Sequence, residues 1–327
     1  MFFTTMIMGS MITISSNSWM GMWIGLEINL LSIIPLLSAN SRTNSAEASI
    51  KYFITQVTAS NIILMAIICM FNNNEQMSNH FNLTLMIQSA LFIKMGAAPF
   101  HSWLPEVTDG LTWINCLILL TWQKIAPMVM LMSVINQEMF IYVVILFSSS
   151  IGSLIGFNQI SLRKIMAYSS INHMGWMIMA MLSNKSIWLI YFIVYSIISV
   201  YTIWIFNLMN VKNISQISSI FKSKILLLFF SMNFLSLGGL PPFLGFLPKW
   251  LTIQQLIFTN NYIIALLMIL LTLIAMFFYL RMSLIPMTIL NQENLMKNSS
   301  SINFIVIFTN FISLIALTSA GFLVNPF

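Results

Sequence analysis

Residues 96–106 read GAAPFHSWLPE and place glycine and proline inside an otherwise apolar stretch of the chain. Residues 239–249, GLPPFLGFLPK, follow 143 positions later with the same pattern, G-x-x-P-F-x-x-x-L-P and then a charged residue. A proline in a helix lacks an N–H group and clashes with a carbonyl of the preceding turn, so the helix breaks and leaves carbonyl groups free. The sequence therefore predicts two broken helices at matching places, with the break residues Gly96, Pro99, Gly239, Pro241 and Pro242.

The composition around these breaks is that of a membrane protein. The 327 residues are 59% hydrophobic and 6% charged, with a mean hydropathy of +0.92, far outside the range of soluble domains. A spanning helix needs roughly 20 apolar residues. We therefore expect an all-α polytopic membrane protein with about eleven transmembrane helices, at residues 1–15, 19–39, 50–71, 81–104, 111–133, 139–157, 162–182, 186–209, 225–257, 260–281 and 302–324.

The net charge of +6 is explained by membrane topology and not by nucleic-acid binding. With the predicted spans alternating in direction, Lys185 falls alone on one face, and nine basic residues fall on the other: Arg42, Lys51, Arg163, Lys164, Lys212, Lys222, Lys224, Arg281 and Lys297. Basic loops mark the inner side of a membrane. The N-terminus is therefore predicted inside, as a first span and not a cleaved signal, and the C-terminus outside.

The two broken helices indicate an internal repeat. Segments interrupted by glycine and proline at matching places in two halves are typical of transporters, with the site near the breaks. The first half runs over residues 15–135 and the second over 158–285, between a first helix at 1–15 and a C-terminal helix at 302–324. Five spans per half is an odd number, which predicts repeats inverted in the membrane. The alternative is that the prolines only kink their helices.

Four ionisable residues lie inside predicted spans, namely Glu27, Lys94, Lys124 and Lys249. A charge at the bilayer centre costs about 2.5–3.5 kcal/mol, so each must face protein or water and find a partner. Burial favours the neutral lysine and a nearby carboxylate favours the charged one. Lys94 would therefore exchange a proton when its distance from Glu27 changes. His101, just after the first break, adds a group that titrates near neutral pH, and we expect these residues to transfer protons.

Apart from Lys124, these residues also have plainer interpretations. Lys94 and Lys249 could extend to the membrane surface, Glu27 could be a structural hydrogen-bonding group, and His101 and His173 could be ordinary interior histidines. Cys69 and Cys116 lie in apolar runs without metal-ligand spacing, and no P-loop, GxGxxG, HExxH or GxSxG element occurs. We therefore expect no metal or cofactor site and no redox chemistry in this chain.

Five longer motifs carry a resemblance to a known family. They are WIGLEIN at 23–29, KMGAAPFHSWLPEV at 94–107, LLTWQKIAPM at 119–128, LRKIMAYSSINHMGWM at 162–177 and LSLGGLPPFLGFLPKW at 235–250. Over residues 15–285 the chain resembles the subunit 2 family of mitochondrial NADH dehydrogenase, the antiporter-like membrane-arm subunits of respiratory complex I. By this resemblance Glu27 and Lys94 match the family's glutamate–lysine pair, Lys124 its central lysine, and Lys249 the residue on its second broken helix.

The resemblance also implies the setting in which the chain works. It would be a proton-translocating subunit of NADH:ubiquinone oxidoreductase in the mitochondrial inner membrane, multi-pass, with its N-terminus on the matrix side and its C-terminus on the intermembrane side. NADH, FMN, iron-sulfur clusters and ubiquinone would be bound by other subunits. Its partners would be other core and accessory subunits, especially neighbouring antiporter-like ones, and membrane lipids including cardiolipin. Two alternatives remain, a stand-alone cation/proton antiporter and a scaffold that only holds neighbouring subunits.

Overall fold

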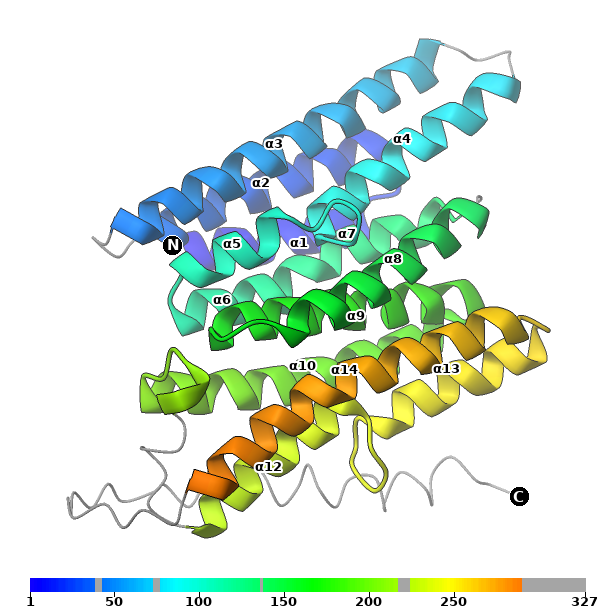
Figure 1. Ribbon diagram of the computed structural model, residues 1–327. Coiled ribbons are helices and arrows are strands. Elements are labelled where there is room, and N and C mark those ends of the chain that lie inside the picture. Colours follow the sequence, from blue (N-terminus) through cyan, green and yellow to red (C-terminus); the bar gives the residue numbers. More distant parts are fainter. Residues whose placement is uncertain (39–42, 73–76, 136–137, 217–223, 290–327) are drawn as a thin grey trace. The chain divides into compact units, whose positions relative to one another are not determined.

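The computed structural model describes residues 1–38, 43–72, 77–135, 138–216 and 224–289, and these residues form helices joined by short turns (Figure 1). In this part of the chain the only β-type pairing is an isolated bridge between Ser161 and Asn213. The prediction of an all-α fold is therefore confirmed for the described residues. The helices are α1 (Phe2–Ser15), α2 (Trp19–Ser38), α3 (Thr43–Asn72), α4 (Met77–Met95), α5 (Trp103–Gly110), α6 (Trp113–Leu120), α7 (Trp122–Ser133), α8 (Glu138–Phe157), α9 (Leu162–Ser183), α10 (Lys185–Met209), α12 (Lys224–Gly238), α13 (Phe246–Phe258) and α14 (Tyr262–Ile289).

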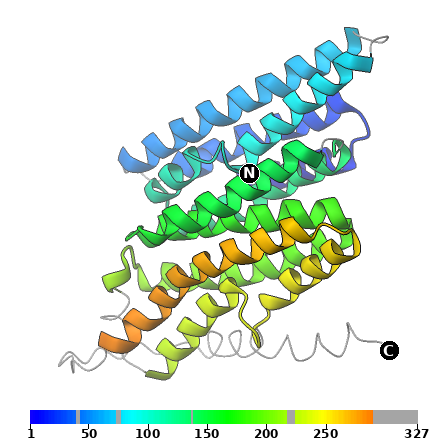
Figure 2. The same cartoon turned by 45° about the vertical axis from the view of Figure 1, so that its right-hand side comes forward.

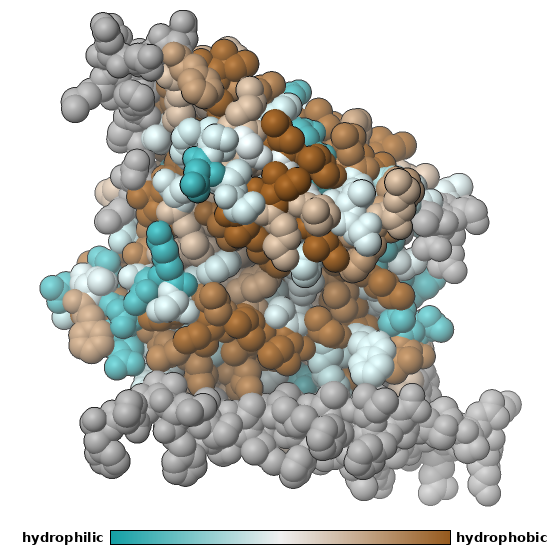
Figure 3. Space-filling model, turned by 180° about the vertical axis from the view of Figure 1, so that it is seen from behind, coloured by the Kyte–Doolittle hydropathy of each residue, from teal (hydrophilic) through white to brown (hydrophobic). Residues whose placement is uncertain are grey.

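Six helical segments within the described residues are long and apolar enough to cross a membrane. They are Trp19–Ser38, Thr43–Phe71, Trp113–Ser133, Met139–Phe157, Lys185–Met209 and Tyr262–Leu284. Many large apolar side chains on the helices are exposed, and brown apolar surface covers much of the face in Figure 3. Exposed apolar surface of this extent suits contact with lipid or with neighbouring membrane helices and not with water.

The other predicted spans within the described residues are short, broken or polar. The short one is α1, which is apolar but has only 14 residues. The broken ones are α4 with α5 and α12 with α13, whose connecting turns are visible in Figures 1 and 2. Helix α9 is unbroken but carries Ser169, Ser170, Asn172 and His173, and most of its residues are buried by protein. A helix surrounded by protein does not need an apolar surface toward lipid, which explains its modest hydropathy. The predicted span 302–324 lies outside the described residues.

A third interruption lies inside the segment 111–133, for which the sequence predicted one continuous span. The helix ends at Leu120 and resumes at Trp122, and Thr121 between them has φ −114° and ψ −72°. Its hydroxyl donates to the carbonyl of Leu117 at 2.7 Å, a back-bond that tends to bend helices. Pro127, one turn further on, has no N–H to donate to the carbonyl of residue 123. These two residues are the only signals of the interruption in the sequence.

The chain divides into two compact units, Met1–Ser148 and Ser149 onward, with the boundary inside α8. In the first unit α3 packs against α2, α4 and α5, and α7 packs against α1, α2 and α4. In the second unit α9 contacts α10, α13 and α14, while α12 lies along α14. Each unit contains one of the two broken helices.

Candidate functional site

The turn that ends α4 has the geometry of a Schellman cap. Gly96 adopts φ +71°, a left-handed conformation that favours glycine. Its N–H donates to the carbonyl of Ile93 at 3.1 Å, and the N–H of Ala97 donates to the carbonyl of Phe92 at 3.0 Å. This pattern pairs two terminal carbonyls of α4 and leaves the carbonyl of Lys94 to be reached from elsewhere.

The turn that ends α12 repeats this backbone 143 positions later. Gly239 has φ +82°, its N–H donates to the carbonyl of Ser236 at 3.0 Å, and the N–H of Leu240 donates to the carbonyl of Leu235 at 3.3 Å. The next hydrogen bond also matches, from Phe243 to Leu240 in this turn and from Phe100 to Ala97 in the first, both 2.9 Å. Each turn also contains one cis peptide, Ala98–Pro99 in the first and Pro241–Pro242 in the second.

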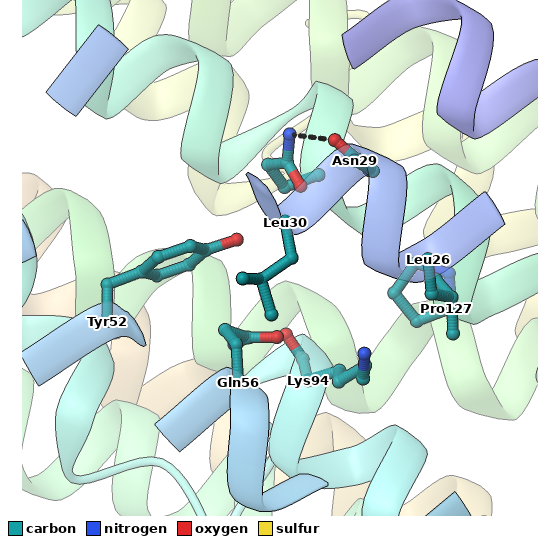
Figure 4. Close-up of a pocket in the computed structure, with 8 residues that line it drawn as sticks. Leu26, Asn29, Leu30, Tyr52, Gln56, Lys94 and Pro127 are labelled. Carbon is teal, nitrogen blue, oxygen red and sulfur yellow. Dashed lines mark hydrogen bonds between the residues drawn. The ribbon is translucent and has the colours of Figure 1, made fainter. Parts of the chain in front are cut away.

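Lys94 lies on the last turn of α4 and faces a small polar cavity (Figure 4). Its side chain is buried, with 7% of the residue exposed, so it does not extend to the surface. The space open to the centres of water molecules is about 20 Å³. One water needs about 10–15 Å³ of such space, so one or two fit. The cavity is lined by Leu26, Asn29, Leu30, Tyr52, Gln56, Lys94, Gln123 and Pro127.

The amide of Gln56, which lines the cavity, also hydrogen-bonds the end of α4 at the first break. Its Nε2 donates to the carbonyl of Lys94 at 3.4 Å, which supplies a partner for one of the carbonyls that the break leaves free. The indole Nε1 of Trp103, after the turn, donates in the same way to the carbonyl of Ile93 at 3.0 Å. Tyr52 packs edge-on against the Trp103 ring, with centroids 5.7 Å apart. The end of α4 is therefore held by neutral side chains from α3 and α5.

Glu27 is half-buried on α2, one turn from cavity residue Leu30. Its carboxylate is near enough to the Lys94 ammonium for their charges to attract, but the two do not form a direct ion pair. Direct ion pairs in the described residues join Lys51 to Glu47 and to Glu106, all three exposed. The structure thus brings Glu27 and Lys94 into the same region, where their charges attract without direct contact.

Lys124 lies two residues after the interruption at Thr121, in the first turn of α7, and is 2% exposed. Its N–H donates to the carbonyl of Thr121 at 3.3 Å. Its neighbour Gln123 faces the Lys94 cavity and donates from Nε2 to Oδ1 of Asn29 at 2.9 Å. The helices that carry Glu27, Lys94 and Lys124 therefore all contribute side chains to one cavity or lie directly beside it.

Lys249 occupies the second break in a different way. It is 6% exposed and its Nζ donates to the carbonyl of Gly238, the last residue of α12, at 2.6 Å. The ammonium also lies 5.8 Å from the centre of the Trp176 ring, within the range of a cation–π contact. The side chain therefore points back into the break and not toward the membrane surface. A Cβ on Gly239 would come within 2.8 Å of Lys249 Cδ, so the lysine packs directly on the glycine.

The sequence of residues 16–275 matches the family described as NADH:quinone oxidoreductase/Mrp antiporter, TM. NADH-ubiquinone oxidoreductase chain 2 of Anopheles gambiae is 48% identical over 322 residues, which make up 96% of this chain and 94% of that protein. The chain 2 of Locusta migratoria is 44% identical over 319 residues, or 97% and 93% of the two chains. The chain belongs to the NADH-ubiquinone oxidoreductase chain 2 family. The resemblance found in the motifs is thereby confirmed.

Solved structures share the fold of this family member at much lower identity. A chain of respiratory complex I from Thermus thermophilus with bound aureothin superposes with a TM-score of 0.86 at 20% identity, covering 97% of this chain and 77% of that one. A chain of the Mrp complex from Dietzia sp. DQ12-45-1b gives a TM-score of 0.78 at 14% identity, covering 98% and 74%. At these identities the likeness establishes the fold alone.

Two histidines of this chain 2 family member differ in their surroundings. His101 is half-buried in the first turn, where its Nδ1 lies 3.2 Å from the carbonyl oxygen of Pro99, and it is not among the residues that line the cavity. His173 on α9 is 5% exposed and its Nδ1 lies 2.9 Å from the hydroxyl of Tyr191. The ring of Tyr195 packs against it, with centroids 5.1 Å apart. His173 is thus an interior histidine with a polar partner, and His101 is tied to its own turn.

Among the described residues no group of three or more His, Cys, Asp or Glu side chains is placed to hold a metal ion. The polar residues that the sequence analysis did not single out are the amides of Asn29, Gln56 and Gln123. Isolated amides in apolar helices carry no spacing signal, and their partners lie 38 to 94 residues away in the sequence. An amide that is buried without a hydrogen-bond partner costs free energy, so an amide in an apolar helix is expected to have a polar partner. This was the only available indication that the three residues belong to a polar site.

Proposed function

We propose that this chain is a proton-translocating membrane-arm subunit of NADH:ubiquinone oxidoreductase, in which quinone reduction elsewhere in the complex drives proton transfer through buried Glu and Lys residues. The observation that carries this proposal is the placement of three lysines, Lys94, Lys124 and Lys249, at or near helix interruptions and at most 7% exposed. Ionisable groups in such places are costly and mark proton or ion pathways. Membership of the chain 2 family supports the same function.

The cavity gives Lys94 the central role in this proposal. Its ammonium faces polar groups and room for water on one side and attraction from Glu27 on another. A rearrangement that moves Lys94 toward or away from Glu27 changes which form of the lysine is favoured. Lys124 and Lys249 are proposed as the next carriers and His101 as an accessory group, with the turns at Gly96, Pro99, Gly239, Pro241 and Pro242 opening the helices for water.

The proposed topology has eleven spans and two five-helix inverted repeats over 15–135 and 158–285. The thirteen described helices regroup into ten spans when α4 joins α5, α6 joins α7 and α12 joins α13. The span at 302–324 would be the eleventh. The matching hydrogen bonds of the two turns support the repeat, and the distribution of basic residues supports an N-terminus in the matrix and a C-terminus in the intermembrane space.

The same proposal places the chain in the mitochondrial inner membrane beside other core and accessory subunits, neighbouring antiporter-like subunits and lipids such as cardiolipin. NADH, FMN, iron-sulfur clusters and ubiquinone are assigned to the other subunits. The small polar cavity has room for one or two waters, which supports proton transfer at this place.

The test is the proton-to-electron ratio of the intact complex with Lys94→Met. Methionine keeps the length and removes the charge, so NADH oxidation should continue while proton translocation falls. Lys185→Met is the matched control, because Lys185 is exposed at the start of α10. An unchanged ratio in Lys94→Met would contradict the proposal. On a native gel the chain should migrate with NADH-oxidising activity, and migration by itself would favour a stand-alone antiporter.

A further inference from the structure

One hydrogen bond in the Lys94 cavity joins two helices that carry proposed proton-transfer groups. The Nε2 of Gln123 on α7 donates to Oδ1 of Asn29 on α2 at 2.9 Å, as the dashed line in Figure 4 marks. Asn29 is 3% exposed, and both residues line the cavity that Lys94 faces. A hydrogen bond between amides that protein largely encloses is expensive to break, because water cannot replace it fully.

The sequence positions of this pair connect it to the charged groups. Asn29 follows Glu27 by two residues on α2, and Gln123 directly precedes Lys124 on α7. Lys94 is on the opposite wall of the same cavity, where Gln56 holds its carbonyl. The Asn29–Gln123 bond is therefore a direct side-chain link between the helix of Glu27 and the helix of Lys124.

The Asn29–Gln123 hydrogen bond matters because α7 begins at a helix interruption. Helix α7 starts at Trp122 directly after the interruption. The N-cap residue Thr121, which precedes it, makes no side-chain capping hydrogen bond. An interrupted helix is not held in register by a continuous ladder of backbone bonds across the break. The first turn of α7, which contains Lys124, is tied to the interruption by the backbone bond from Lys124 to Thr121. The amide bond from Gln123 adds a side-chain contact that holds this turn beside the cavity.

We infer that the Asn29–Gln123 hydrogen bond is a positioning contact for proton transfer, which holds the interrupted helix of Lys124 against the cavity of Lys94. The inference rests on the proposed function. Asn29 and Gln123 do not themselves take up or release the transferred proton. They fix the distance over which a proton must pass between the cavity and Lys124, and a displacement of about 1 Å at such a site is enough to slow a reaction strongly.

The experiment compares four variants in the intact complex reconstituted into vesicles, with NADH oxidation and proton uptake measured together. Gln123→Met and Asn29→Leu each remove the bond with little change of volume. The double exchange Asn29→Gln with Gln123→Asn keeps two facing amides and their combined length. Asn115→Leu is the matched control, because Asn115 on α6 donates to the carbonyl of Leu36 on the same α2 at 3.0 Å but lies outside the cavity.

We expect either single variant to lower proton uptake per NADH oxidised by about two- to tenfold, the effect of one lost hydrogen bond. The double exchange should restore most of it, and Asn115→Leu should leave it unchanged. Normal uptake in both single variants, or an equal loss in Asn115→Leu, would overturn the inference. If one single variant does not assemble, the other breaks the same bond. Failure of the proposed function is separate, since it would leave Lys94→Met pumping normally.

Discussion

At the first turn the terminal carbonyls of α4 accept hydrogen bonds from the Gln56 amide and the Trp103 indole, whereas at the second turn the carbonyl of Gly238 accepts one from the Lys249 ammonium. Three backbone hydrogen bonds of the first turn recur at matching positions in the second. The difference lies in the side chains that complete them. Because neutral groups hold the first turn, Lys94 faces the cavity, while Lys249 at the second turn is itself the group that holds the helix end.

The largest expected effect comes from giving the second turn a residue of the first. Gly245 matches Ser102 in the repeat, and a Cβ at Gly245 would overlap the backbone carbonyl of Ser236. Gly245→Ser should therefore destabilise the chain by about 3 kcal/mol or more, the upper end for overpacking, and abolish assembly of the complex on native gels. The reverse change, Ser102→Gly at an exposed position, should cost under about 1 kcal/mol. Normal assembly of Gly245→Ser would show that the two turns are interchangeable after all.

Removing the two lysines should separate stability from proton transfer. Lys249→Met leaves the buried carbonyl of Gly238 without its donor, a loss of about 1–3 kcal/mol. Lys94→Met leaves the capping bond from Gln56 in place. Both variants should pump less, but only Lys249→Met should also lower the thermal stability of the purified complex. Equal melting temperatures for the two would contradict the capping role of Lys249.

The smallest effect is expected where the repeat places opposite charges. Glu106 matches Lys249 in sequence, but it lies on the exposed side of α5 and pairs with Lys51 at 3.0 Å. Exposed ion pairs contribute little and are screened by salt. Glu106→Gln should therefore assemble and pump like the parent in the same vesicle assay. If Glu106→Gln lowered proton pumping as much as Lys249→Met does, the charged residue after the break would have the same role in both turns.

The sequence predicted what local chemistry decides and missed what depends on distant partners. Proline and glycine interrupt a helix wherever they stand, so the turns at Gly96 and Gly239 were visible without a structure. The interruption at Thr121 was not, because a hydroxyl that bonds its own preceding turn resembles any other threonine in an apolar run. The cavity amides escaped for another reason, since nothing near Asn29 in the sequence indicates that Gln123 will meet it.

At the second turn, where Lys249 donates to the carbonyl of Gly238, the charge of one side chain also sets the strength of a helix cap. A neutral amine is a weaker donor than an ammonium. Under the proposed function, a proton that leaves Lys249 would therefore also loosen the end of α12 against its turn, and the stiffness of this helix end would follow the protonation of one side chain. At the first turn the Gln56 amide can donate its hydrogen whether Lys94 is charged or neutral, so under the proposed function the end of α4 would keep this bond throughout.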